Sequence, residues 1–128
     1  MPLVRIELRA GATPADQRAI ADGVHQALVE TIGIPAADRF QLISEYAADH
    51  FIYDPSYLDI PRTDQIVILQ ITISSGRTLE QKRMLYRRIT ELLAERPGIR
   101  PEDVFVNLVE VAKENWSFGR GIAQYAPE

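Results

Sequence analysis

Residues 65–74, QIVILQITIS, form the strand on which the predicted fold of this chain is built. The run Ile66-Val67-Ile68-Leu69 is almost continuously apolar, which is typical of a strand buried on both faces of a sheet. A second stretch, Leu3-Val4-Arg5-Ile6-Glu7-Leu8, alternates apolar and charged residues, as β-strands do. The chain therefore contains two predicted strands, each of which opens a longer repeated segment.

The repeat emerges when the sequence is shifted by 65 positions, which carries Gly33-Ile34 onto Gly98-Ile99. The same shift superposes further pairs in both halves: Gly11 and Gly76, Thr13 and Thr78, Arg18 and Arg83, Asp38 and Asp103, Phe40 and Phe105, Glu45 and Glu110. Residues 2–46 and 65–111 are thus two copies of one unit.

Each unit is predicted to be strand, helix, strand. The helices open at Thr13, followed by Pro14, and at Thr78, where Gln81 completes a capping box. Gly33 and Gly98 are the expected helix stops, and the returning strands are expected at 40–46 and 104–111. Two right-handed βαβ units give an α/β (α+β two-layer) fold, with a four-stranded mixed sheet covered on one face by two helices.

Such a two-layer fold leaves one face of the sheet open, and an apolar strand at 66–73 favours burial there by another copy of the chain. The insertion at 47–63 and the tail at 112–128 have no counterpart under the shift. We expect one domain over 1–128, assembled as an oligomer, with function or assembly carried by the two additions.

Composition narrows the class of protein. The chain has 128 residues, 46% hydrophobic, no cysteine and a net charge of −4, with 14 basic residues among 18 acidic ones. This charge balance lacks the basic field of a nucleic-acid binder. The sequence shows neither a signal peptide nor an apolar run of membrane-spanning length, so a cytoplasmic protein is expected.

Pro2 becomes the amino terminus once Met1 is removed. An amino-terminal proline is a secondary amine, and at the start of a central strand its nitrogen is held in one place. It can then move protons or attack a carbonyl, although most Met-Pro termini do neither. Pro2 is the candidate nucleophile or base.

Arg77 and Asp38 are the other candidate catalytic residues. Arg77 precedes the capping Thr78, where a guanidinium beside a helix N-terminus suits a carboxylate, unless it is an ordinary solvated arginine. Asp38 precedes a returning strand and can exchange protons with a substrate. Its counterpart Asp103 occupies the matching place, so an aspartate here also fits a turn-stabilising role.

The remaining candidates carry weaker signals. His25 and His50 lack partners at metal-ligand spacing, and neither is assigned a role. The tail sequence Trp116-Ser117-Phe118-Gly119-Arg120-Gly121 places two aromatic residues at alternate positions, either to wall a pocket or to pack a turn.

Together, Pro2, the two βαβ halves, Asp38, Gly76-Arg77-Thr78 and Trp116-Ser117-Phe118-Gly119 resemble the tautomerase superfamily. Within it, the sequence is most similar to the malonate semialdehyde decarboxylase group. The resemblance implies a homotrimer that covers the open sheet face, an enzyme without cofactor or metal, and Pro2, Asp38 and Arg77 as catalytic residues.

It also implies a small 2-oxo or 3-oxo carboxylic acid as substrate, with Arg77 binding the carboxylate and Trp116, Phe118 and Tyr125 excluding water. The decarboxylase pattern has two arginines separated by one residue, whereas this chain has Ser75-Gly76-Arg77. Arg120 is our hypothesis for the missing second cation.

Two choices stay open at this point. A cationic Pro2 amine suits decarboxylation and a neutral one suits keto–enol tautomerisation; a carboxylate beside the amine favours the first, and nearby cations with apolar walls favour the second. The alternative from another class is a non-catalytic trimeric binding or signalling module with the same fold.

Overall fold

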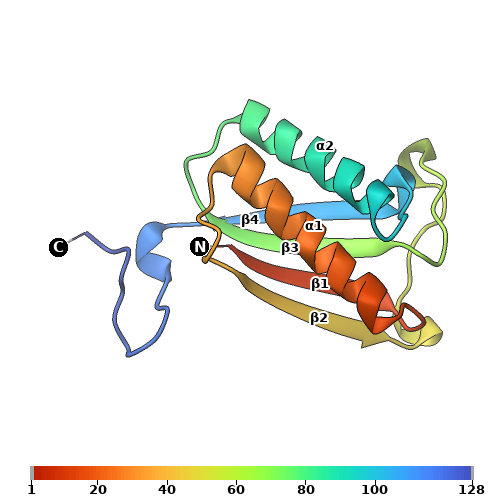
Figure 1. Ribbon diagram of the computed structural model, residues 1–128, viewed down its shortest axis with the longest axis horizontal. Helices are drawn as coiled ribbons and strands as arrows, with labels where there is room; N and C mark the ends of the chain where they lie inside the picture. Colours follow the sequence, from red (N-terminus) through yellow and green to blue (C-terminus); the bar gives the residue numbers. More distant parts are fainter. Residues whose placement is uncertain (1, 128) are drawn as a thin grey trace.

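Two βαβ units lie side by side in the computed structural model, which describes residues 2–127 (Figure 1). The strands are β1 (Leu3–Arg9), β2 (Phe40–Tyr46), β3 (Val67–Ser74) and β4 (Val104–Val111). The helices are α1 (Pro14–Ile32) and α2 (Leu79–Glu95), and both cover the same face of the sheet. The predicted two-layer α/β architecture is confirmed.

The strand order is β2-β1-β3-β4. Each unit contributes a parallel pair, β1 with β2 and β3 with β4, and the antiparallel pairing of β1 with β3 joins the units. In that central pair Leu3 lies opposite Thr72, and Leu8 lies opposite Val67. The start of β1 therefore meets the end of β3.

The repeat is visible in the backbone and not only in the sequence. Gly11 and Gly76 turn the chain with φ angles of 128° and 124°. Beyond these turns, Thr13 Oγ1 and Thr78 Oγ1 each accept a hydrogen bond of 3.1 Å from the backbone N–H three residues on. The predicted capping box of α2 is present, since Gln81 reaches back to the Thr78 N–H.

The core lies between the sheet and the helices. The side chains of β1 and β3 that point toward the helices are fully buried, and they meet apolar residues of α1 and α2: Val4, Ile6, Leu8, Val67, Leu69, Ile71 and Ile73 against Ile20, Val24, Leu28, Leu85, Ile89 and Leu93. Burial of this apolar area, at about 25 cal/mol per Å², is the main stabilising contribution.

In one chain, only the helix-facing side of β3 is buried throughout. On the face away from the helices, Ile68 is half-buried, Gln70 is exposed and Thr72 is half-buried, so the strand alternates like any other. Val67, Leu69, Ile71 and Ile73 point into the core, and Ile66 lies before the strand begins. The apolar surface of the open face is instead contributed by Phe40, Leu42 and Phe105, which are 52%, 48% and 46% exposed.

One predicted helix end also differs. Gly33 closes α1 in the left-handed conformation, as expected, with φ 71°. In the second unit the cap is Arg96, because Pro97 cannot continue the helix. Gly98 lies two residues beyond this cap, where its N–H bonds the carbonyl of Leu93.

The insertion is tied to the sheet by a buried aspartate. Asp103 is 1% exposed, and its carboxylate accepts hydrogen bonds from the Thr63 N–H at 2.7 Å and the Thr63 hydroxyl at 2.6 Å. Arg100 lies 3.5 Å from the same carboxylate. The turn-stabilising role considered for an aspartate at this position is therefore the role of Asp103.

Replacement of Asp103 by alanine should lower the free energy of unfolding by about 3 kcal/mol, because it removes two hydrogen bonds to a buried charge and leaves the Thr63 donors unpaired. Urea unfolding measures this loss. Asp49→Ala, at an exposed position of the same insertion, is the control and should change stability by less than about 0.5 kcal/mol. Equal effects of the two substitutions would contradict the assigned role.

Candidate active site

One end of the sheet gathers most of the predicted site residues. Pro2 is buried and immediately precedes Leu3, which pairs with Phe40 at the start of β2 and with Thr72 near the end of β3. The residue before β2 and the turn after β3 therefore flank Pro2. Met1, whose removal would expose the Pro2 nitrogen, lies outside the described residues.

Asp38 is held at this end by a tight turn. Its N–H bonds the carbonyl of Pro35 at 2.9 Å, and the ring Nε2 of His25, on α1, lies 2.9 Å from the carbonyl oxygen of Ala36. The carboxylate is half-buried, with Oδ2 turned away from solvent. His25, to which the sequence assigned no role, thus ties the Asp38 turn to a helix.

Arg77 lies in the turn between β3 and α2. Its guanidinium donates a 3.1 Å hydrogen bond to the carbonyl of Ser74, the last residue of β3, and the side chain is half-buried. This arrangement differs from that of a fully solvated arginine, because one N–H is used to hold the group against the strand end. The remaining N–H groups of the guanidinium suit a carboxylate.

A charged pair supports the same turn. Glu110 of β4 forms an ion pair with Lys82 of α2. The Lys82 ammonium holds the pKa of Glu110 below its ordinary value, and the Gly76 N–H and the charge of Arg77 act in the same direction. Glu110 is therefore an anchor for the turn that carries Arg77.

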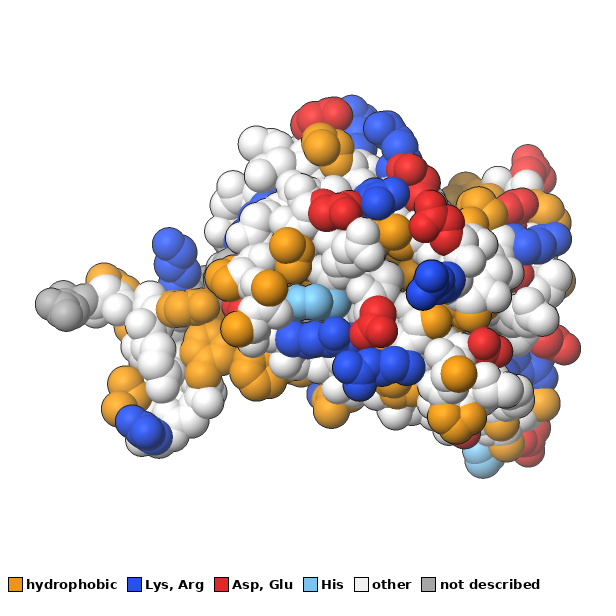
Figure 2. Space-filling view, viewed as in Figure 1, with side chains coloured by type: hydrophobic (Ala, Val, Ile, Leu, Met, Phe, Trp, Pro, Cys, Tyr) orange, Lys and Arg blue, Asp and Glu red, His pale blue; other side chains and the backbone are white. Residues whose placement is uncertain are grey.

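Aromatic rings form a cluster where the tail leaves the sheet. Trp116 stacks on Phe118 with ring centroids 5.4 Å apart, and Phe118 contacts Tyr125 at 4.8 Å and Phe40 at 6.4 Å. Figure 2 shows hydrophobic side chains gathered where the tail meets the body. Phe40 was not predicted as a site residue; its position directly after the Asp38 turn was the available signal.

Arg120 is not brought to the same place. It is exposed, with φ 61°, in a turn that Gln124 closes through bonds to Phe118 and Gly119. Figure 1 places the tip of this tail away from the turn between β3 and α2. By strand register and chain connectivity, Pro2, Asp38, Arg77 and the start of the tail lie at the same end of the sheet, whereas Arg120 lies in an exposed turn of the tail.

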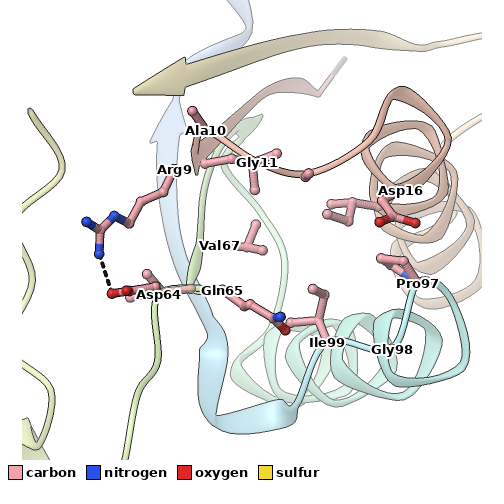
Figure 3. A pocket seen from close by; sticks show the side chains of 14 residues that line it. Arg9, Ala10, Gly11, Asp16, Asp64, Gln65, Val67, Pro97, Gly98 and Ile99 are labelled. Carbon is pink, nitrogen blue, oxygen red and sulfur yellow. Dashed lines mark hydrogen bonds and ion pairs between the residues drawn. The ribbon is translucent and has the colours of Figure 1, made fainter. Parts of the chain in front are cut away.

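A cavity of about 390 Å³ lies at the opposite end of the sheet (Figure 3). Its lining includes Val67, Gly11 and Ala12, which the repeat places in the positions of Pro2, Gly76 and Arg77. Arg9 points out of this cavity toward Asp64, with which it forms an ion pair. At this end, Val67 has only a main-chain amide nitrogen in the place of the Pro2 amine. Ala12 likewise stands in the place of the Arg77 guanidinium.

Within residues 2–127, no group of three or more His, Cys, Asp or Glu side chains is arranged to hold a metal ion. Among the same residues, no helix is both long enough and apolar enough to cross a membrane.

Comparison with known sequences identifies the family. Two family models described as tautomerase enzymes match the chain, one over residues 2–60 and the other over residues 38–119. The chain belongs to the tautomerase family. The matched ranges include Pro2, Asp38, Arg77, Trp116 and Phe118, whereas Arg120 and Tyr125 lie beyond both.

Relatives of this tautomerase-family chain refine the group. A probable tautomerase of Bacillus subtilis (strain 168), YusQ, is 41% identical over 124 residues, covering 97% of this chain and 98% of the relative. A malonate semialdehyde decarboxylase inhibited by 3-bromopropiolate is 41% identical, with a TM-score of 0.90 and coverage of 96% and 93%.

A fused 4-OT wild type symmetric trimer is 25% identical, with a TM-score of 0.80 and coverage of 98% and 99%. Within the tautomerase superfamily, the chain lies in the malonate semialdehyde decarboxylase-like group, as the sequence motifs predicted.

Proposed function

We propose that this tautomerase-family chain is an amino-terminal-proline enzyme that acts on small 2-oxo or 3-oxo carboxylic acids, by keto–enol tautomerisation or by decarboxylation of the malonate semialdehyde type. One observation carries the proposal: the buried Pro2 shares a sheet end with Asp38, Arg77 and the aromatic cluster. The similarity to a malonate semialdehyde decarboxylase supports it.

The comparison of the two sheet ends supports an acidic substrate. Where the first unit has Ala12 and Gln17, the second has Arg77 and Lys82, although Gln17 and Lys82 make equivalent contacts to Glu45 and Glu110. The fold tolerates neutral residues at both positions. Since Lys82 is paired with Glu110, Arg77 supplies the extra positive charge, which fits the recognition of a carboxylate.

In the tautomerase reaction, the neutral Pro2 nitrogen removes a proton from one position of the oxo acid and returns it to another, between oxygen and carbon. Arg77 holds the carboxylate during this exchange, and Asp38 accepts or donates a second proton. Trp116, Phe118 and Tyr125 exclude water, which strengthens these electrostatic interactions.

In the decarboxylase reaction, the cationic Pro2 polarises the 3-oxo group. Alternatively, the Pro2 nitrogen loses its proton, attacks the 3-oxo carbon as the neutral amine and condenses with it to an iminium ion with loss of water. The C–C bond to the carboxylate then breaks and CO₂ leaves. The electron pair of that bond forms the C=C bond of the enol or enamine, while the π pair of the C=O or C=N bond moves onto the oxygen or nitrogen. Protonation of the resulting enol or enamine carbon, followed by hydrolysis where an iminium has formed, releases the aldehyde.

Untagged protein and its Pro2→Ala variant, each assayed with phenylpyruvate enol and with malonate semialdehyde, test the proposal. We expect turnover of at least one substrate by the natural chain and a loss of at least 100-fold in the variant, because alanine supplies a primary amine of altered geometry. Acetaldehyde release indicates the decarboxylase, and ketonisation alone indicates the tautomerase.

Intact mass spectrometry must accompany this assay. A chain that retains Met1 has an amide nitrogen at Pro2 and should be inactive. Full processing without turnover of either substrate would contradict the proposed chemistry and favour the non-catalytic binding module.

The two arginines should differ in their effect on KM. Arg77→Ala is expected to raise KM for an oxo acid by about tenfold to 100-fold, the loss of a charge-assisted hydrogen bond. Arg120→Ala raises KM as well if the tail supplies the second cation that we propose. Steady-state kinetics measures both, with Arg83→Ala on the exposed face of α2 as control; an unchanged KM in Arg120→Ala removes this residue from the site.

We further propose that the chain forms a homotrimer through the open face of the sheet. Phe40, Leu42 and Phe105 expose apolar surface there, and the fused 4-OT neighbour is a symmetric trimer. Burial of the face by other copies would remove this surface from water.

Leu42→Arg should reduce the mass measured by light scattering from that of a trimer to that of a monomer, because an arginine cannot be buried unpaired in an apolar contact. Ile52→Arg is the matched control, since Ile52 is 91% exposed in the insertion. A wild-type chain that is monomeric at micromolar concentration would contradict the assembly.

A further inference from the structure

Ser74 is a buried polar residue that the proposed chemistry does not use. Its exposed fraction is 0%, and the other buried polar side chain of residues 2–127 is that of Asp103, whose role is structural. Ser74 ends β3, and by continuation of the register it lies one residue beyond the position opposite Pro2. Ser74 therefore lies at the end of the sheet that carries Pro2 and Arg77.

Two groups of the site converge on this serine. The indole Nε1 of Trp116 donates a 3.1 Å hydrogen bond to the Ser74 hydroxyl, and the guanidinium of Arg77 donates a 3.1 Å hydrogen bond to the Ser74 carbonyl. The hydroxyl and the main chain thus hold different partners. A side-chain substitution separates the two contacts, because it leaves the carbonyl in place.

The fold itself does not require a serine here. The repeat places Arg9 at the equivalent end of β1, where the side chain points outward to Asp64. A large charged residue is therefore compatible with this position of the βαβ unit. The small, buried hydroxyl is therefore a feature of the second unit alone and not a requirement of the fold.

Besides the bond to Ser74, the aromatic cluster is held by contacts of Phe118 with Phe40 and Tyr125 and by the hydrogen bond from the Phe118 N–H to Gln124. Phe118 and Tyr125 are 37% and 39% exposed, and the tail that carries them runs away from the body (Figure 1). Trp116 stacks on Phe118 within 7° of parallel, so the orientation of the indole sets the orientation of the next ring. The bond from Trp116 to Ser74 fixes that indole against the sheet.

We propose that Ser74 is a positioning residue for the reaction at Pro2: its hydroxyl orients Trp116 and, through the stack, the ring of Phe118 that walls the site. This inference rests on the proposed function. Ser74 acts through the aromatic rings, and its carbonyl separately orients Arg77.

Ser74→Ala should lower kcat by about fivefold to tenfold, because the indole N–H loses its acceptor and the wall loses its fixed orientation. KM for an acidic substrate should change less than twofold, since the carbonyl still holds Arg77. Ser56→Ala, which alters an exposed serine of the insertion, is the matched control and should leave both constants unchanged.

Trp116 is the chain's single tryptophan, so its fluorescence reports the contact without any assay of turnover. We expect acrylamide to quench Ser74→Ala at least twofold more strongly than wild type. If the alanine variant does not fold, Ser74→Cys, of similar volume and weaker acceptor strength, replaces it. Unchanged quenching overturns the proposal.

A double-mutant cycle completes the test. Trp116→Phe removes the donor, and Ser74→Ala should then lower kcat no further. Independent, multiplicative losses in kcat would overturn the positioning role. Should wild type turn over neither substrate, the proposed function fails, and the quenching result alone decides whether Ser74 anchors the tail.

Discussion

The antiparallel pairing of β1 with β3 determines which parts of this chain meet. Parallel pairing within each βαβ unit gives two similar halves, but only the central pair sets the start of one strand beside the end of another. Because Leu3 lies opposite Thr72, the Pro2 end of the chain, the turn that holds Arg77 and the root of the tail share one end of the sheet. A shift of this register by two residues would preserve the hydrophobic core, since side chains alternate with a period of two, and would separate Pro2 from Ser74.

The pseudo-symmetry of the fold supplies an internal control for the site. Both ends have the glycine turn, the capped helix and an aspartate before a returning strand. At one end Asp103 is buried against Thr63 and the helix contact of Glu45 is a neutral Gln17. At the other end the guanidinium of Arg77 and the ammonium of Lys82 are present. Features common to the two ends are requirements of the fold. The features found only at the Pro2 end, above all Arg77, are the candidates for function.

Most of the architecture was predictable, because the signals are local. Helix caps, glycine turns and the apolar periodicity act over a few residues, and the repeat doubled each signal. The start of β3 was less predictable, because an apolar run does not reveal where a strand begins; Ile66 lies outside the strand, and the residues after it alternate in burial. The predicted end of α2 at Gly98 was too late, because Pro97 cannot continue the helix and the cap is therefore Arg96. Phe40 was missed because its contact with Phe118 joins segments that are distant in sequence.

The sequence by itself determined the two βαβ units, the family and the candidate residues Pro2, Asp38 and Arg77. Hydrophobic periodicity, helix capping and the order of motifs are local properties of the sequence, so they can be recognised without the structure. Only the tertiary structure decided that Asp103 ties down the insertion, that Ser74 joins Trp116 to the strand end, and that Arg120 lies in an exposed turn closed by Gln124. Those outcomes depend on hydrogen bonds between residues about 40 positions apart and on the path of a tail without strand or α-helix. No local propensity specifies such contacts, since they form when packing of the sheet brings the partners within bonding distance.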